Sequence, residues 1–265
     1  MPKSGTTWVQ RICRAHPKMH CRAGDQYPRY WSNINDLVKQ YSDLIDLRDQ
    51  QRDHQGIESL SPNDCVKLFY AMIRITLEKA PKQLDWSGIK DLTLSGKGSL
   101  QMIPNSRAVH IIRDPRDIAI LTWAHGRRIA PPTLDYPERV SDEFLMSTAR
   151  HWRALIRRAE IVRTESSGRS FDIRYEDQAL NFSSTVGELL AFYDVARDPP
   201  TIEALRLETD FTRLSGGRVP GQTDASSCFR KGLAGDWRTT LSKAQIALVN
   251  KICGAELQAQ GYEWK

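Results

Sequence analysis

The loop at residues 2–8, Pro-Lys-Ser-Gly-Thr-Thr-Trp, constrains the fold more than any other segment. Gly5 permits a tight turn, and the hydroxyl residues after it open a helix whose first backbone N–H groups have no partner within the helix. Such a helix N-terminus, with the mobile charge of Lys3 beside it, suits a phosphate or sulfate group. The loop therefore predicts an α/β fold built around an anion site.

Only Met1 precedes this loop. Phosphate-binding loops of this kind usually follow a buried parallel strand. Without that strand, backbone groups of its neighbours would be left unpaired in the core. We therefore expect that the first strand is missing from this chain and that the N-terminus is incomplete.

Strand and helix patterns alternate along the rest of the chain. The β-branched run at residues 107–112 is typical of a buried parallel strand, residues 170–174 are expected to form another strand, and residues 19–22 are a weaker candidate. Helical spacing and capping patterns predict helices over residues 7–15, 61–79, 118–124, 144–162, 182–193 and 242–260. Loops are expected at residues 24–31, at 126–137 as a lid, and at 216–230. The order predicts one domain, residues 1–265, with a three-layer α/β/α sandwich and a central parallel sheet like that of P-loop NTPases.

Composition narrows the class of ligand. Lys and Arg exceed Asp and Glu by 38 to 32 and are scattered along the chain, which favours a small polyanion over nucleic acid. The five cysteines form no closely spaced pair, which argues against a disulfide framework or a zinc site. No apolar run approaches the roughly 18 residues of a transmembrane helix. We therefore expect a cytoplasmic protein without a metal.

Three motifs occur in a characteristic order: the loop at residues 2–8, Arg-Asp-Pro-Arg-Asp at 113–117, and Arg-Lys-Gly-Leu-Ala-Gly-Asp-Trp-Arg at 230–238. With them the chain resembles the sulfotransferases that use 3′-phosphoadenosine 5′-phosphosulfate (PAPS). The resemblance spans nearly the whole chain, since residues 174–177 also fit the family. It implies that the first motif holds the 5′-phosphosulfate, that the second holds the 3′-phosphate, and that the third closes over the nucleotide.

The residues of these motifs suit a donor with phosphates at both ends of a nucleoside. Arg113 and Arg230 can form bidentate hydrogen bonds with the 3′-phosphate, supported by Lys231 and by the amide of Gly232. The resemblance implies that aromatic side chains stack on the adenine, although Trp8 in a helix core and Tyr175 as a packing residue remain the alternative. The expected donor site, for PAPS and its product PAP, comprises Lys3, Ser4, Gly5, Thr6, Thr7, Trp8, Arg113, Tyr175, Phe229, Arg230, Lys231 and Gly232.

Sulfuryl transfer depends on positioning and charge stabilisation. Lys3, with the amides and hydroxyls of Thr6 and Thr7, would stabilise the charge that develops on the departing 5′-phosphate. Cytosolic relatives use a histidine in a Lys-Thr-His context as the base, where this chain has Lys90-Asp91-Leu92-Thr93. Carbohydrate and tyrosyl-protein sulfotransferases use a glutamate after a His-Pro, and here Asp25 follows His16-Pro17.

The general base is therefore left open between two carboxylates, with Asp25 favoured over Asp91. His20 is a weaker rival, and His110 is expected in the core. His125, on the expected lid, contacts either an acceptor or water. The family's serine, eight residues after its arginine, is replaced here by Leu121, with Thr122 beside it.

Two other functions compete with sulfuryl transfer. One is a catalytically impaired homologue that only binds PAPS or PAP. The other is a P-loop kinase, which requires a GxxxxGK sequence that this loop lacks.

The acceptor is expected to contact the variable loops at residues 24–31, 36–59 and 124–137. Tyr27, Tyr30, Trp31, Arg127 and Arg128 suggest a phenol or an acidic glycan. The same side chains suit subunit contacts, so a homodimer is left open.

Overall fold

The computed structural model describes residues 3–23, 27–52, 62–90, 100–131, 133–224, 227 and 230–264. These residues include four short strands, β1 (Met19–Ala23), β2 (Trp86–Lys90), β3 (Ala108–Ile112) and β4 (Ser170–Arg174). The strands form two parallel pairs, β1 with β2 and β3 with β4. The three strands predicted from the sequence are confirmed, and β2 is an addition.

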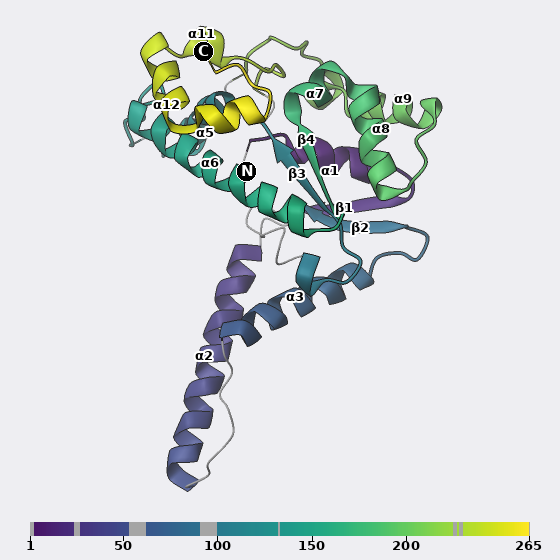
Figure 1. The fold of residues 1–265 in the computed structure, drawn as a ribbon, viewed down its shortest axis with the longest axis vertical. Helices are drawn as coiled ribbons and strands as arrows, with labels where there is room; N and C mark the ends of the chain where they lie inside the picture. Colours follow the sequence, from purple (N-terminus) through teal and green to yellow (C-terminus); the bar gives the residue numbers. More distant parts are fainter. Residues whose placement is uncertain are drawn as a thin grey trace.

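Helices make up most of the described chain. They are α1 (Thr6–Ala15), α2 (Tyr27–Arg52), α3 (Pro62–Glu78), α5 (Pro115–Ile129), α6 (Asp142–Glu165), α7 (Tyr175–Leu180), α8 (Phe182–Tyr193), α9 (Pro199–Glu208), α10 (Phe211–Leu214), α11 (Trp237–Thr240) and α12 (Lys243–Ala259). On one side of β3 and β4 lie α5, α6 and α12, and on the other side lie α1, α7, α8 and α9 (Figure 1). This layering confirms the predicted α/β class with parallel strands.

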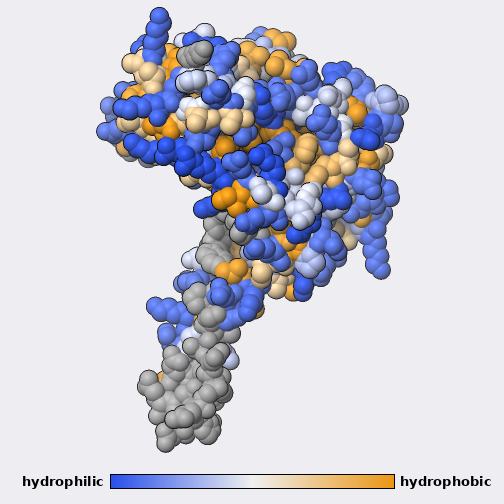
Figure 2. Space-filling view, viewed as in Figure 1, coloured by the Kyte–Doolittle hydropathy of each residue, from blue (hydrophilic) through white to orange (hydrophobic). Residues whose placement is uncertain are grey.

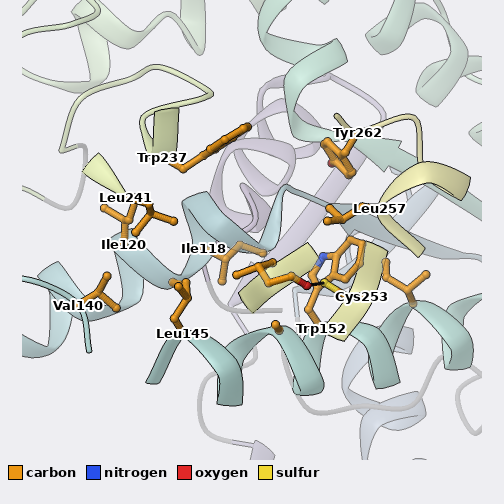
Figure 3. Close-up of a cluster of buried hydrophobic side chains, with 14 of the residues drawn as sticks. Ile118, Ile120, Val140, Leu145, Trp152, Trp237, Leu241, Cys253, Leu257 and Tyr262 are labelled. Carbon is orange, nitrogen blue, oxygen red and sulfur yellow. Dashed lines mark hydrogen bonds between the residues drawn. The ribbon is translucent and has the colours of Figure 1, made fainter. Parts of the chain in front are cut away.

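Two hydrophobic clusters hold these layers together. The first joins α5, α6, α11 and α12, and Figure 3 shows Trp152 beside Leu257, with Leu145 further along α6 in the same cluster. The second lies between α1, the strands, α8 and α9, and includes Ile12, Ile173 and Leu189. The first cluster lies beside the start of α5, and the second lies beside the anion loop. The core therefore fixes the elements that carry the expected donor residues.

Helix α2 differs from the rest of the body. It extends away from the strands and packs against α3 (Figure 1). The expected loop at residues 24–31 is wrong for Tyr27 onward, because these residues form the first turn of α2. Apolar side chains along α2, including Leu37 and Leu44, are exposed. Elsewhere the face shown in Figure 2 is mainly hydrophilic, with apolar side chains in small groups.

Helix α5 starts earlier and ends later than expected. Asp114 caps it by accepting a hydrogen bond from the backbone N–H of Arg116, and Pro115 occupies its first turn. At the other end Gly126 lies within the helix, and a Cβ there would meet Tyr136 Oη at 2.5 Å. Since Trp123 also donates a hydrogen bond to the carbonyl of Pro137, the segment after the helix folds back onto it. The expected lid is therefore shorter, and it packs on α5.

Candidate functional site

The anion loop has the geometry that its sequence predicts. Gly5 has a φ of 100°, and its carbonyl accepts hydrogen bonds from the backbone N–H groups of Trp8 and Val9, at 2.9 and 3.2 Å. A Cβ at this position would lie 2.6 Å from the ring of Tyr175. Only glycine fits both the backbone and the space, so the loop packs directly against the residue that follows β4.

Arg113 brings the three motifs together. It lies just after β3 and is buried, with 6% of its surface exposed. One terminal nitrogen donates to the carbonyl of Lys3 at 3.4 Å, and the other donates to the carbonyl of Leu233 at 3.1 Å. The guanidinium also lies 3.9 Å from the ring centroid of Tyr175. A single side chain therefore contacts the anion loop, the C-terminal segment and the end of β4.

Asp117 holds the C-terminal segment against α5. Its two carboxylate oxygens accept hydrogen bonds from the backbone N–H groups of Gly235, at 2.7 Å, and Trp237, at 3.1 Å. Asp117 also pairs with Arg113 at 3.5 Å and is 1% exposed. The sequence analysis did not select Asp117, because this role depends on partners about 120 residues away.

The C-terminal motif at residues 230–238 contributes two further positively charged side chains. Arg230 and Lys231 both pair with the carboxylate of Asp236. Burial lowers the pKa of Arg230, and the charge of Asp117 opposes this shift. Gly232 has a φ of 68°, and a Cβ there would lie 2.5 Å from the ring of Phe211.

The two arginines expected at the 3′-phosphate have unused hydrogen-bonding capacity. Within the described part of the chain, the Nε atoms of Arg113 and Arg230 are buried without a hydrogen-bond partner. Such donors are normally satisfied in proteins. A bound anion in this place would supply an acceptor.

Buried contacts of the neighbouring residues hold the start of α5, directly after Arg113, in place. Arg116 forms a buried ion pair with Asp114 at 2.6 Å and lies 3.5 Å from the ring centroid of Trp237. Glu176 accepts hydrogen bonds from the backbone of Asp114 and from the hydroxyl of Tyr262. Burial raises the pKa of both carboxyl groups, Asp114 and Glu176. Contacts from α7, α11 and Tyr262 therefore hold the motif at residues 113–117 in place.

Two of the three aromatic side chains expected at the adenine lie in the described part of the chain, and they contact each other. The rings of Trp8 and Tyr175 meet edge to face, with centroids 5.6 Å apart, and the ring of Phe182 lies 6.1 Å from that of Trp8. Trp8 packs against the second hydrophobic cluster. The third aromatic, Phe229, lies outside the described residues.

Both candidates for the general base, Asp25 and Asp91, also lie outside the described residues. The strands that precede them end side by side, since Ala23 of β1 is opposite Lys90 of β2. Lys90 Nζ donates to Thr7 Oγ1 at 3.4 Å, so a second lysine approaches the anion loop. The sequence analysis quoted Lys90 only as part of a comparison and gave it no role.

The three histidines considered in the sequence analysis, His20, His110 and His125, lie in different elements. His110 pairs with Asp172 of the neighbouring strand at 3.0 Å, within the β3–β4 pair. His20 lies in β1 opposite Ser87. His125 lies near the end of α5, where its Nδ1 is 2.9 Å from a guanidinium nitrogen of Arg128.

The described residues contain no group of three or more His, Cys, Asp or Glu side chains arranged to hold a metal ion. None of their helices combines the length and apolar character needed to cross a membrane.

The family model of the sulfotransferase domain matches residues 1–261. The chain belongs to the sulfotransferase family. Among curated relatives, this sulfotransferase is 28% identical to mouse carbohydrate sulfotransferase 5 over 178 residues, and 22% identical to Arabidopsis thaliana cytosolic sulfotransferase 12 over 171 residues. Each match covers 60% of this chain, and 42% and 52% of the respective relatives. The chain thus matches only about half of each relative's length.

Solved sulfotransferases share the fold of the chain. A mouse sulfotransferase complexed with PAP aligns with a TM-score of 0.60 at 16% identity, over 97% of this chain and 81% of the other. The sulfotransferase domain of a Synechococcus olefin synthase aligns with a TM-score of 0.55 at 17% identity, over 100% and 93%. A retinol dehydratase in complex with androsterone and PAP aligns with a TM-score of 0.54 at 15% identity, over 97% and 78%. At these identities the likeness establishes the fold alone.

Proposed function

We propose that the chain transfers the sulfuryl group of PAPS to a hydroxyl or amine of an acceptor. The observation that carries this proposal is the position of Arg113, which contacts the anion loop and the C-terminal segment at once. Those are the two segments expected to hold opposite ends of the donor. The structural neighbours crystallised with PAP add support.

At the 3′-phosphate, Arg113, Arg230 and Lys231 supply positive charge. Their present partners are buried carboxylates and backbone carbonyls, and the two unpartnered Nε atoms leave room for new acceptors. The amide of Gly232 is the expected fourth donor. Charge-assisted hydrogen bonds of this kind are the strongest that proteins make, so this element would supply most of the donor affinity.

At the other end, Ser4, Gly5, Thr6 and Thr7 would cradle the 5′-phosphosulfate at the start of α1. Lys3 would stabilise the charge on the departing 5′-phosphate oxygen. Lys90, which contacts Thr7, brings a second positive charge to this end. Trp8, Tyr175 and Phe229 would contact the adenine.

The proton of the acceptor goes to a carboxylate. Asp25 is the favoured base, and Asp91 is the alternative. Strand β1 ends at Ala23, shortly before Asp25 in the sequence, and strand β2 ends at Lys90, directly before Asp91. These two strand ends are neighbours, and Lys90 contacts Thr7 of the anion loop. A carboxylate serves as a base near neutral pH if partial burial raises its pKa.

For the acceptor we propose a phenol or an acidic glycan. A cavity of about 490 Å³ lies at the end of α5, lined by Arg127, Thr133, Leu134, Asp135 and Tyr136 among others. It combines an aromatic ring, a hydroxyl, a carboxylate and a cation, which suits an aromatic molecule whose anionic group pairs with Arg127. We also propose a cytoplasmic location, in line with the named cytosolic relative.

The test is transfer of radiolabelled sulfate from PAPS to a panel of phenols, sugars, alcohols and amines. The wild-type chain should label at least one acceptor, and the Lys3→Ala variant should lower the rate about 100-fold. The control is Lys79→Ala, which changes an exposed lysine just after α3 and should leave the rate unchanged. Tight PAP binding without transfer to any acceptor would instead support a binding protein that has lost catalysis.

A further inference from the structure

The short segment after α12 packs against the body of the chain. The match to the family model ends at residue 261, so Tyr262, Glu263 and Trp264 follow the matched part. The backbone N–H of Tyr262 donates to the carbonyl of Leu257 at 2.9 Å, and Asn250 donates to the carbonyl of Trp264 at 2.6 Å. Tyr262 is buried in the first hydrophobic cluster, beside Leu257 (Figure 3).

Tyr262 is connected to the motif at residues 113–117 through one carboxylate. Its hydroxyl donates a hydrogen bond to Glu176 Oε2 at 2.8 Å. Glu176 Oε1 accepts a hydrogen bond from the backbone N–H of Asp114 at 3.1 Å. An ionised carboxylate can only accept hydrogen bonds, and here each oxygen has its own donor. Glu176 therefore bridges the segment after α12 and the residue that follows Arg113.

The peptide group between Arg113 and Asp114 is held on both sides. Its N–H donates to Glu176, and its carbonyl, that of Arg113, accepts a hydrogen bond from Trp152 Nε1 at 2.9 Å. Because a peptide group is planar and includes the Cα atoms on both sides, fixing its nitrogen and oxygen also fixes the Cα of Arg113. The direction in which the side chain of Arg113 leaves the backbone therefore depends on this bridge.

Glu263 makes a second connection to the same motif. Its carbonyl accepts a hydrogen bond from Arg116 Nη2 at 2.7 Å, and Arg116, which is fully buried, pairs with Asp114. Because this contact uses the backbone of Glu263, a side-chain substitution there does not remove it. Tyr262 allows a cleaner test, since Tyr262→Phe removes the hydroxyl and keeps the ring, whose centroid lies 4.5 Å from the guanidinium of Arg174.

We propose that Tyr262 is a positioning residue for the 3′-phosphate, because through Glu176 it orients the peptide group that carries Arg113. The inference rests on the PAPS site proposed above and adds to it a residue beyond the family match. A binding side chain reaches its full affinity only when surrounding hydrogen bonds hold it in the productive geometry. Tyr262 thereby favours nucleotides with a 3′-phosphate without contacting them.

Titration calorimetry of the whole chain with PAP and with adenosine 5′-phosphate, which lacks the 3′-phosphate, tests this role. Tyr262→Phe should bind PAP about tenfold more weakly and keep its affinity for adenosine 5′-phosphate within about threefold. The matched control is Tyr193→Phe, which removes a tyrosine hydroxyl beside the second hydrophobic cluster and should bind both nucleotides like the wild-type chain. Equal weakening for both nucleotides in Tyr262→Phe would show general damage to the fold and overturn the proposal.

A double variant and amide hydrogen exchange test the bridge itself. Glu176→Leu removes the carboxylate, so adding Tyr262→Phe to it should weaken PAP binding by less than about twofold. Additive losses would contradict a connection through Glu176. In Tyr262→Phe alone, the amide hydrogen of Asp114 should exchange about tenfold faster or more, because its acceptor is held less firmly. Unchanged exchange would also overturn the proposal, and this measurement does not require Glu176→Leu to fold.

The outcomes separate this inference from the proposed function. If the wild-type chain binds PAP no more tightly than adenosine 5′-phosphate, both fail. If the wild-type chain prefers PAP and Tyr262→Phe keeps the full preference, only the role of Tyr262 is overturned. A smaller preference in Tyr262→Phe together with faster exchange at Asp114 supports both.

Discussion

The carboxylate of Asp117 lies 2.7 Å from the backbone nitrogen of Gly235, across 118 residues of sequence. The same side chain accepts a hydrogen bond from the backbone of Trp237 and pairs with Arg113. One buried carboxylate therefore fixes the C-terminal segment and the arginine expected at the 3′-phosphate. We therefore expect the proposed donor site to depend on Asp117, without direct contact between Asp117 and the nucleotide.

Asp117→Asn should weaken PAP binding about tenfold, because an amide has one acceptor oxygen and no charge to hold Arg113. Titration calorimetry measures the affinity. Glu203→Gln, on the exposed surface of α9, is the control and should bind PAP like the wild-type chain. Unchanged affinity in Asp117→Asn would show that the C-terminal segment is held by other contacts.

Gly5→Ala should destabilise the chain more than Gly168→Ala does. Both glycines have positive φ, 100° and 80°, but a Cβ at position 5 meets Tyr175 at 2.6 Å, whereas a Cβ at position 168 meets nothing within 4 Å. We expect about 1 kcal/mol for the backbone at either position and about 1–3 kcal/mol more at position 5. Urea unfolding measures both. Equal losses would mean that the loop does not pack on Tyr175.

Glu176→Gln should change how stability depends on pH. Burial raises the pKa of Glu176 above its usual value of 4.5, so the folded chain holds this proton more tightly than the unfolded chain does. Relative to Glu176→Gln, the wild-type chain should therefore lose stability as the pH rises from 4.5 towards the higher folded pKa. Urea unfolding of both proteins at several pH values measures the difference. A difference that is independent of pH would contradict the shift.

Local patterns were enough to predict part of the fold. The bounds of β4 and α8 agree with those expected from the sequence, because β4 alternates polar and apolar residues and because Asn181 and Asp194 flank α8. The expected helix over residues 118–124 begins too late, since Asp114 and Pro115 already form the cap and the first turn of α5. Strand β2 was missed because Ser87, Gly88 and Lys90 weaken its apolar pattern.

The candidate site was predictable where its residues form motifs and not where their partners are distant. Arg113 and Gly5 were selected from short patterns, and both lie at the centre of the observed contacts. Asp117 and Lys90 act through residues far away in the sequence, so no local pattern marks them. Likewise, the contact between His125 and Arg128 depends on side-chain directions that the sequence alone does not give.

The most direct test of the donor site compares PAP with adenosine 5′-phosphate, which lacks the 3′-phosphate, in the wild-type chain and in Arg113→Lys. The wild-type chain should bind PAP about 100-fold more tightly, because the 3′-phosphate gains charge-assisted hydrogen bonds. Arg113→Lys should bind PAP about 30-fold more weakly and leave the affinity for adenosine 5′-phosphate within about threefold. Equal affinity of the wild-type chain for the two nucleotides, or binding of neither, would contradict the assignment of the three motifs to one PAPS site.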